Sequence, residues 1–260
     1  MKKLSPFHLI GYATTAFVRN FGTLLGLTAP GLLVFVAAAV VGRLLLPPGA
    51  AAEAQLALGE AGIVLSLGML ATNLALIPAF TGWHRLLILG EARRENGRTF
   101  GWDGREWRYL RNLISIWLVS VGVNLVARLL APAAEATPAL AIVIVVTLLF
   151  CHLWIWAIGG MTLPAAALND GRSFADIVNL LQGNVNRIGL ALIGIGLLIG
   201  FVGFLLIMTL SAIGLASGSV YLSFVMTFLL YFIGLFAVVS VLSRAYALLA
   251  GAGSPPAPSL

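Results

Sequence analysis

The sequence predicts an all-α integral membrane protein with six transmembrane helices, arranged as three parallel helical hairpins. Each hairpin is expected to follow a short amphipathic helix on the cytoplasmic membrane face. Apolar residues make up 60% of the chain and charged residues only 9%, a composition typical of membrane proteins. Residues 188–243 contain no ionisable Asp, Glu, Lys, Arg or His. At about 1.5 Å per residue, this stretch exceeds twice the roughly 30 Å hydrocarbon thickness and must fold back on itself.

A short pattern of Gly, Arg, a hydroxyl residue and Phe also recurs before long apolar runs. Its clear copies are GRTF at 97–100 and GRSF at 171–174, and a degenerate copy, KLSPF, occupies 3–7. The helices that begin at these copies are expected to end at Arg19-Asn20, Arg111-Asn112 and Asn186-Arg187. The recurrence predicts one structural unit used three times within a single domain over 1–250, with units at 5–97, 98–171 and 172–250. A short disordered cytoplasmic tail is expected at 251–260.

Segment length and hydropathy place the six spans along the chain. They are expected at 22–42, 62–83, 111–131, 139–161, 188–210 and 220–242. The break between the last two is expected at 211–219, where small and polar residues interrupt the apolar pattern. Close packing between helices is predicted at two pairs of glycines four residues apart, namely Gly22 with Gly26 and Gly196 with Gly200.

The distribution of Lys and Arg predicts the orientation, because basic residues resist translocation across the membrane. The basic residues of one side are Lys2, Lys3, Arg19, the seven arginines within 85–111, Arg172, Arg187 and Arg244. The other side has only Arg43 and Arg128. Both termini are therefore expected in the cytoplasm, and the first span is expected to be retained. The net charge of +6 is then a topology signal, and a nucleic-acid partner is not expected.

Hydroxyl residues in each repeat are expected to start the amphipathic helices. Ser5, Thr99 and Ser173 stand at these positions, and a side-chain oxygen there accepts a hydrogen bond from an unpaired N–H of the first turn. Asp176 follows Ser173 by three residues, which is the spacing of a capping box. The glycines that open the two clear copies are expected to adopt the left-handed conformation that ends the preceding helix.

Apolar residues recur at helical spacing behind each of these caps. They are Phe7, Ile10, Phe17 and Phe21 in the first copy, Phe100, Trp107 and Leu110 in the second, and Phe174, Ile177, Leu181 and Val185 in the third. Aromatic rings and long arginine stems suit the headgroup boundary, where one end of a side chain is apolar and the other hydrated. These helices are therefore expected to lie along the cytoplasmic face.

This order of short amphipathic helix, basic residue with Asn, and transmembrane hairpin resembles the bacterial six-span inner-membrane proteins of the YciC type. It is also similar to the membrane domain that precedes some glycerophosphodiester phosphodiesterases. The likeness covers most of 5–248 and implies a multi-pass protein of the bacterial inner membrane. Where that membrane domain is fused to a catalytic barrel, the barrel carries the hydrolysis. The resemblance therefore implies an architecture and not an activity.

The most distinctive surface is the cytoplasmic stretch 83–112, which contains seven arginines, four acids and five aromatic residues. Such a mixture is suited to anionic lipid headgroups, with each basic residue near the surface contributing on the order of 1 kcal/mol. A membrane-protein partner and a purely structural anchor with internal ion pairs are the alternatives. The candidate lipid or partner contacts are Arg98, Trp102, Arg105, Trp107, Arg108, Arg111, Arg172 and Arg187.

Polar residues inside membrane spans are costly and are candidates for function. Asn73, Asn124 and His152 are the residues of this kind. They either line a transport path or donate hydrogen bonds between helices, for which Asn and His are commonly used. No Asp or Glu lies in any expected span, which removes the usual ion-binding group of a coupled transporter.

Catalytic, cofactor-binding and metal-binding residues are not predicted. His8, His84 and His152 fall in an interfacial helix, at a span end and inside the membrane, and Cys151 is the only cysteine. We therefore expect a non-enzymatic inner-membrane protein that organises lipid or assists a membrane complex through its cytoplasmic interfacial helices. A passive or lipid-type transporter with a path between hairpins is the alternative, because internal repeats are also common in transporters.

Overall fold

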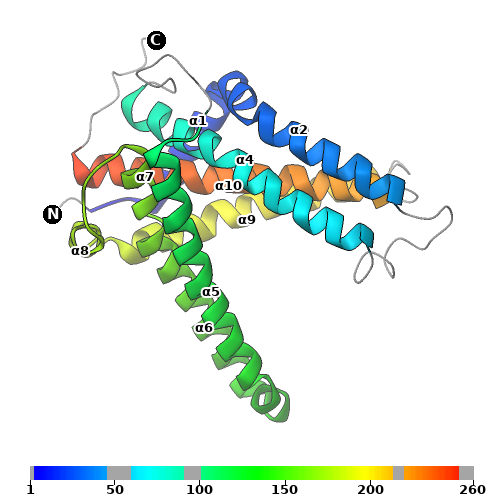
Figure 1. The fold of residues 1–260 in the computed structure, drawn as a ribbon. Helices are drawn as coiled ribbons and strands as arrows, with labels where there is room; N and C mark the ends of the chain where they lie inside the picture. The colour runs from blue at the N-terminus through cyan, green and yellow to red at the C-terminus, as the bar shows by residue number, and fades with distance from the viewer. Residues whose placement is uncertain (1–2, 46–59, 91–100, 213–219, 252–260) are drawn as a thin grey trace.

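The computed structural model describes residues 3–45, 60–90, 101–212 and 220–251. Regular structure in these residues is helical, and they contain no strand. The helices of the described chain are α1 (Pro6–Arg19), α2 (Phe21–Leu45), α4 (Glu60–Leu89), α5 (Gly104–Ala136), α6 (Pro138–Gly159), α7 (Thr162–Ala167), α8 (Phe174–Leu180), α9 (Val185–Ala212) and α10 (Val220–Ala250) (Figure 1). The predicted all-helical class is confirmed, whereas the tail expected at 251–260 lies almost entirely outside the described residues.

Five stretches of these helices are long and apolar enough to cross a membrane. They are Phe21–Ala38, Gly104–Pro132, Ala139–Ala167, Val185–Thr209 and Leu229–Ala250. The expected span 62–83 lies within α4, whose 30 residues extend about 45 Å at 1.5 Å per residue, but α4 is not among the five. The chain is thus a helical protein with several helices suited to a membrane.

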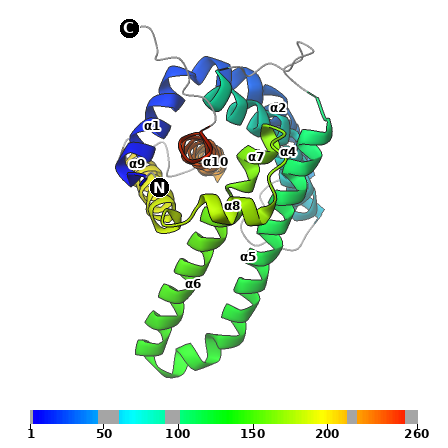
Figure 2. The same ribbon diagram turned by 90° about the vertical axis from the view of Figure 1, so that its left-hand side faces the viewer.

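The long helices associate in pairs, α2 with α4, α5 with α6, and α9 with α10. Helix α10 is central, because it contacts α1, α4, α7 and α9. Viewed along its axis in Figure 2, α10 is surrounded by the other elements at this end of the molecule. The core accordingly forms around α10, with Phe236, Leu242 and Tyr246 fully buried.

The α5–α6 pair departs from the expected parallel arrangement. Figure 1 shows that α2, α4, α9 and α10 run together, whereas α5 and α6 extend away from them at a steep angle. Helix α5 contacts α7 and α4, and α6 contacts α9 and α7. Figures 1 and 2 place these contacts at one end of the pair, so that its far end is without neighbours among the described helices.

Two of the predicted helix starts are confirmed. The Ser5 hydroxyl accepts a hydrogen bond from the His8 N–H at 3.4 Å, with Pro6 at the first position of α1. In the third unit the Ser173 hydroxyl accepts from the Asp176 N–H at 3.2 Å, and the Asp176 carboxylate accepts from the Ser173 N–H at 2.8 Å. These reciprocal bonds form the predicted capping box at the start of α8.

The second helix start differs from the prediction. Thr99 lies outside the described residues, but 101–103 are not helical and α5 begins at Gly104. The Asp103 carboxylate accepts the Arg105 N–H at 2.7 Å, and Glu106 accepts the Asp103 N–H at 2.9 Å. An acidic residue followed three positions later by Glu is itself a helix-starting pattern. Helix α5 then continues without a break through the turn that was expected at 111–112.

The helix ends expected at the repeat glycines also differ. Helix α4 ends at Leu89, and Gly90 has a left-handed φ of 78°, whereas Gly97 lies outside the described residues. Helix α7 ends before Asn169, which has a φ of 58°. The Asp170 N–H donates to the Ala165 carbonyl at 2.9 Å, the six-residue closure of a helix end in which Asn replaces the more usual Gly. The prediction for Gly171 is therefore wrong by two residues.

Close helix packing occurs at other glycines than those predicted. A Cβ at Gly31 would lie 2.5 Å from Leu76, and one at Gly68 would clash with the Ala38 Cβ, so these glycines permit the close approach of α2 and α4. A Cβ at any of the predicted positions would meet no atom within 4 Å, which applies to Gly22, Gly26, Gly196 and Gly200. Two glycines four residues apart are thus insufficient to identify the face of a helix that packs closely against another helix.

Candidate functional site

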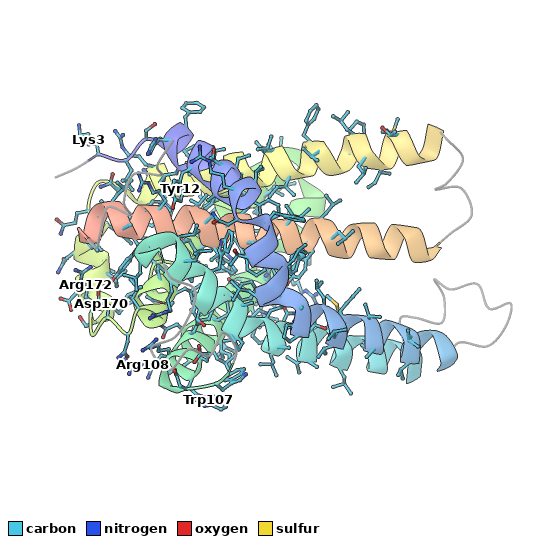
Figure 3. All side chains as sticks on the ribbon, turned by 90° about the horizontal axis from the view of Figure 1, so that it is seen from above. Lys3, Tyr12, Trp107, Arg108, Asp170 and Arg172 are labelled. Carbon is cyan, nitrogen blue, oxygen red and sulfur yellow. The ribbon has the colours of Figure 1, made fainter. Side chains whose placement is uncertain are left out.

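A cavity of about 740 Å³ lies where α5, α6, α7 and α8 meet. One part of its lining is polar and basic, with Arg108, Arg111, Asp170 and Arg172. Trp154 and other apolar side chains of α5 and α6 form the rest. Figure 3 shows Arg108, Asp170 and Arg172 at the same end of the molecule as Lys3. The cavity therefore joins a basic rim to an apolar wall.

Helical periodicity in α5 accounts for much of this lining. Arg108, Arg111, Ser115 and Val119 line the cavity, and their spacings of three or four residues place them on one face of a helix. Three arginines and one aspartate line the cavity, which gives it a formal excess of two positive charges. Arg108 and Arg111 are exposed, so their guanidinium groups are accessible to a ligand.

Arg172 is held in place by contacts from two directions. Its Nε lies 3.5 Å from the Asp170 carboxylate, and its Nη1 donates to the Tyr246 hydroxyl at 3.3 Å. The guanidinium carbon lies 5.6 Å from the centroid of the Tyr246 ring, within cation–π range. The Tyr246 hydroxyl in turn donates to the Asp170 carboxylate. Helix α10 thereby positions a charged side chain at the cavity, although α10 itself does not line it.

The junction of α5 with α6 and α7 is fixed by one polar contact and one close approach. The Asn112 side chain donates to the Thr162 carbonyl at 3.2 Å. A Cβ at Gly159 would lie 2.8 Å from Ile116, so the glycine allows α6 to approach α5 closely. These contacts fix the position of α5, which carries Arg108 and Arg111, relative to α6 and α7, which supply apolar lining.

Helix α8 and its N-cap border the cavity through Ser173, Phe174 and Ile177. The capping box at its start also affects a titration. Hydrogen bonds from the Ser173 side chain and backbone hold the pKa of Asp176 below its ordinary value, and the nearby Arg172 adds to this shift. Asp176 is thus ionised at neutral pH, and its carboxylate is bonded to Ser173 at the helix start.

The other predicted surface residues have separate environments. Arg98 lies outside the described residues. Trp102 and Trp107 are exposed, with ring centroids 5.0 Å apart, near the start of α5. Arg105 does not line the cavity. The Arg187 Nη1 donates to the Leu4 carbonyl at 2.7 Å, so Arg187 joins the third unit to the beginning of the first.

The three predicted intramembrane polar residues have different hydrogen-bond partners. Asn73 accepts from the Tyr231 hydroxyl at 3.3 Å and thereby bridges α4 and α10. Asn124 donates to the Ser120 carbonyl at 3.0 Å, and the His152 Nδ1 lies 2.9 Å from the Leu148 carbonyl, both within their own helices. None of the three lines the 740 Å³ cavity.

Sequence reasoning missed a buried polar cluster that joins α4, α5 and α10. The Ser243 hydroxyl donates to the Val239 carbonyl at 2.7 Å and therefore accepts from the His84 Nδ1, also at 2.7 Å. The assigned neutral tautomer leaves the His84 Nε2 to accept from the Tyr109 hydroxyl at 3.4 Å. His84 and Ser243 are fully buried, and the polar positions on α10 were the available signal.

A second part of this cluster involves an acid and a tryptophan. The Thr81 hydroxyl lies 2.8 Å from a Glu106 carboxylate oxygen, and the Trp83 indole donates to the Ser240 hydroxyl at 2.9 Å. Glu106 is only 1% exposed. Because buried polar groups are stable only when they are paired, the cluster specifies how the three helices dock.

Within the described residues, no group of three or more His, Cys, Asp or Glu side chains is arranged to hold a metal ion. No protein family, curated protein or solved structure matches the chain.

Proposed function

We propose that this protein binds anionic phospholipid headgroups in the basic cavity between α5 and α8, and thereby organises lipid at the cytoplasmic face of a bacterial inner membrane. The observation that carries the proposal is the convergence of Arg108, Arg111 and Arg172 on one 740 Å³ cavity that also has an apolar wall. Guanidinium groups form bidentate hydrogen bonds with phosphate, and an apolar wall suits the part of a lipid next to its headgroup.

The proposed topology has six spans in three hairpins, with both termini in the cytoplasm. It is supported by the helical pairs and by the side on which most basic residues lie. The test uses a Cys151→Ser background with single cysteines introduced at Glu53 or Gly97. We expect a membrane-impermeant thiol reagent to label these two positions from opposite sides. Labelling of both from the same side would contradict the six-span arrangement.

The headgroup proposal is tested with the double variant R108Q/R111Q. Phosphatidylglycerol and phosphatidylcholine are compared in nanodiscs by native mass spectrometry of retained lipid. If each arginine contributes on the order of 1 kcal/mol, the preference for phosphatidylglycerol falls roughly 30-fold in the variant. Arg172 is left in place because it also contacts Asp170 and Tyr246, so its replacement would disturb the local structure as well as the charge.

The matched control is R19Q/R128Q, which removes the same charge from two exposed arginines that do not line the cavity. We expect it to keep most of the lipid preference. An equal loss in both double variants would mean that net charge alone attracts anionic lipid. An unchanged preference in R108Q/R111Q would reject the cavity as the headgroup site.

A further inference from the structure

A second cavity, of about 630 Å³, lies between α5 and α6. Its lining comes from Val119, Gly122 and Val126 on α5 and from Val143 and Cys151 on α6, together with similar side chains. Thr147 supplies the only hydroxyl of this lining. We refer to this second cavity as the α5–α6 groove. Its surface suits a hydrocarbon chain and offers little to a polar ligand.

The α5–α6 groove continues the basic cavity. Val119 lines both, and the positions 111, 115, 119, 122 and 126 follow one face of α5 at spacings of three and four residues. The distance along α5 from Ser115 to Val126 is about 16 Å at 1.5 Å per residue. That length is close to half of the roughly 30 Å hydrocarbon thickness, which is the depth of one leaflet.

We propose that the α5–α6 groove holds an acyl chain of the same anionic lipid whose phosphate binds at Arg108 and Arg111. The proposal rests on the proposed headgroup site and adds the ligand class, a whole phospholipid instead of a free phosphate or a headgroup alone. The basic cavity suits the phosphate of a phospholipid, and the apolar groove that continues from it suits the attached acyl chain. The groove is lined by residues of α5 and α6 alone, and Figure 1 shows no other described helix beside the far part of this pair.

Gly122 provides the means to fill the groove without disturbing the fold. It lines the groove, and a Cβ at this position would meet no atom within 4 Å. In G122W the indole therefore occupies space that the acyl chain needs. The matched control is G200W on α9, because Gly200 is exposed and a Cβ there also meets no atom within 4 Å.

The two tryptophan variants are compared with two probes, dioleoyl phosphatidylglycerol and the short-chain dihexanoyl phosphatidylglycerol. Because the indole of G122W takes the space of the acyl chain, the long-chain lipid loses its van der Waals contacts with the groove, and we expect its affinity to fall roughly tenfold. We expect this loss in G122W only, with binding of the short-chain lipid unchanged in both variants. Equal losses in G122W and G200W, or no loss in G122W, would overturn the acyl-chain proposal.

Cys151 allows the position of the bound acyl chain to be measured directly. It is the only cysteine of the chain, is exposed, and lines the groove. A small thiol-reactive fluorophore at Cys151 should be quenched more strongly by phosphatidylglycerol with brominated chains than by brominated phosphatidylcholine. This preference should disappear in R108Q/R111Q. The control position is Leu205→Cys on α9, which is exposed, in a Cys151→Ser background.

The outcomes separate the two proposals. A preference for the anionic lipid at Cys151, absent at residue 205, supports the acyl-chain site. If R108Q/R111Q removes anionic-lipid retention but Cys151 never distinguishes the two lipids, the headgroup site stands and the acyl-chain site is rejected. If neither retention nor quenching depends on lipid charge, the headgroup proposal fails, and the acyl-chain proposal fails with it.

Discussion

Helix α10 and the α5–α6 pair contain candidate membrane spans of similar mean hydropathy but different burial. An 18-residue stretch within Leu229–Ala250 of α10 has 61% of its residues buried, whereas the corresponding stretches within Gly104–Pro132 and Ala139–Ala167 each have 6% buried. The segments of α10 and α5 have the same mean hydropathy. Hydropathy therefore identifies a helix that tolerates lipid, but it does not distinguish a helix that faces lipid from one that faces protein.

The placement of polar side chains does distinguish them. On α10, Ser240 and Ser243 are fully buried and bond to side chains of α4. On α5, Glu106 and Tyr109 bond to side chains of α4 near the start of the helix. Asn124 further along α5 and His152 on α6 bond to carbonyls of their own helices. Association of helices in a membrane relies on packing and interhelical polar contacts, because lipid tails are as apolar as the side chains. The central position of α10 follows from these contacts, and much of the apolar surface of α5–α6 is exposed.

The largest test of this contrast is a pair of Phe→Ala substitutions. Phe236 on α10 is fully buried against Phe80, Trp83 and Phe232, whereas Phe150 on α6 is 59% exposed. F236A should lower the free energy of unfolding by about 3 kcal/mol, the lower end of the range for buried Phe, because a cavity remains in the packed interior.

F150A should change that free energy by less than about 0.5 kcal/mol, as expected for a surface position. The measurement is unfolding of both variants in the same detergent, followed by circular dichroism. Comparable losses in F236A and F150A would mean that α5–α6 is packed as tightly as α10, and the contrast between the two regions would not hold.

A smaller effect is expected from the polar cluster. S243A removes the acceptor of the His84 Nδ1–H, and a buried donor left without a partner costs about 1–3 kcal/mol. N124A removes an exposed side chain that bonds only to the Ser120 carbonyl of its own helix, so little change in unfolding free energy is expected. The two variants are compared in the same unfolding assay. A larger loss in N124A would show that Asn124 supports an interhelical contact.

The parts of this structure that sequence reasoning predicted are the local ones. Ser173 and Asp176 are three residues apart, so their capping box depends on no other part of the chain. The second start was misplaced because Asp103 and Glu106 provide a competing pair that lies closer to the span. Local patterns predict that a helix starts, but two adjacent patterns of similar strength do not reveal which one is used.

The cavity and the polar cluster depend on contacts between distant residues. His84 and Ser243 are separated by 159 positions, and Arg172 is oriented by Tyr246, 74 positions further along the chain. Arg108, Arg111 and Arg172 were candidates because basic and aromatic residues gather in the predicted cytoplasmic segments. The steep angle between α5–α6 and the other helices was not predicted. Pairing of helices three or more elements apart leaves no periodic signal in a single sequence.

The smallest effect concerns α8, which borders the cavity between the two compared regions. Hydrogen bonds from Ser173 hold the pKa of Asp176 below its ordinary value. A carboxyl group with a lowered folded-state pKa stabilises the fold above its unfolded pKa, about 4. That stabilisation is lost as the pH falls through the folded-state value. Amide hydrogen exchange in α8, corrected for intrinsic rates, should therefore become faster under acid conditions in the native protein.

The matched variant D176N keeps the shape of the side chain but lacks the titrating group. Its α8 exchange should show no corresponding pH dependence, and exchange in the core of α10 should be the same in both proteins, because the capping box is confined to the exposed start of a short helix. If the pH response extends to α10, the cavity rim and the α10 core unfold as one unit. The buried helix α10 and the exposed α5–α6 pair could then not be treated as regions of independent stability.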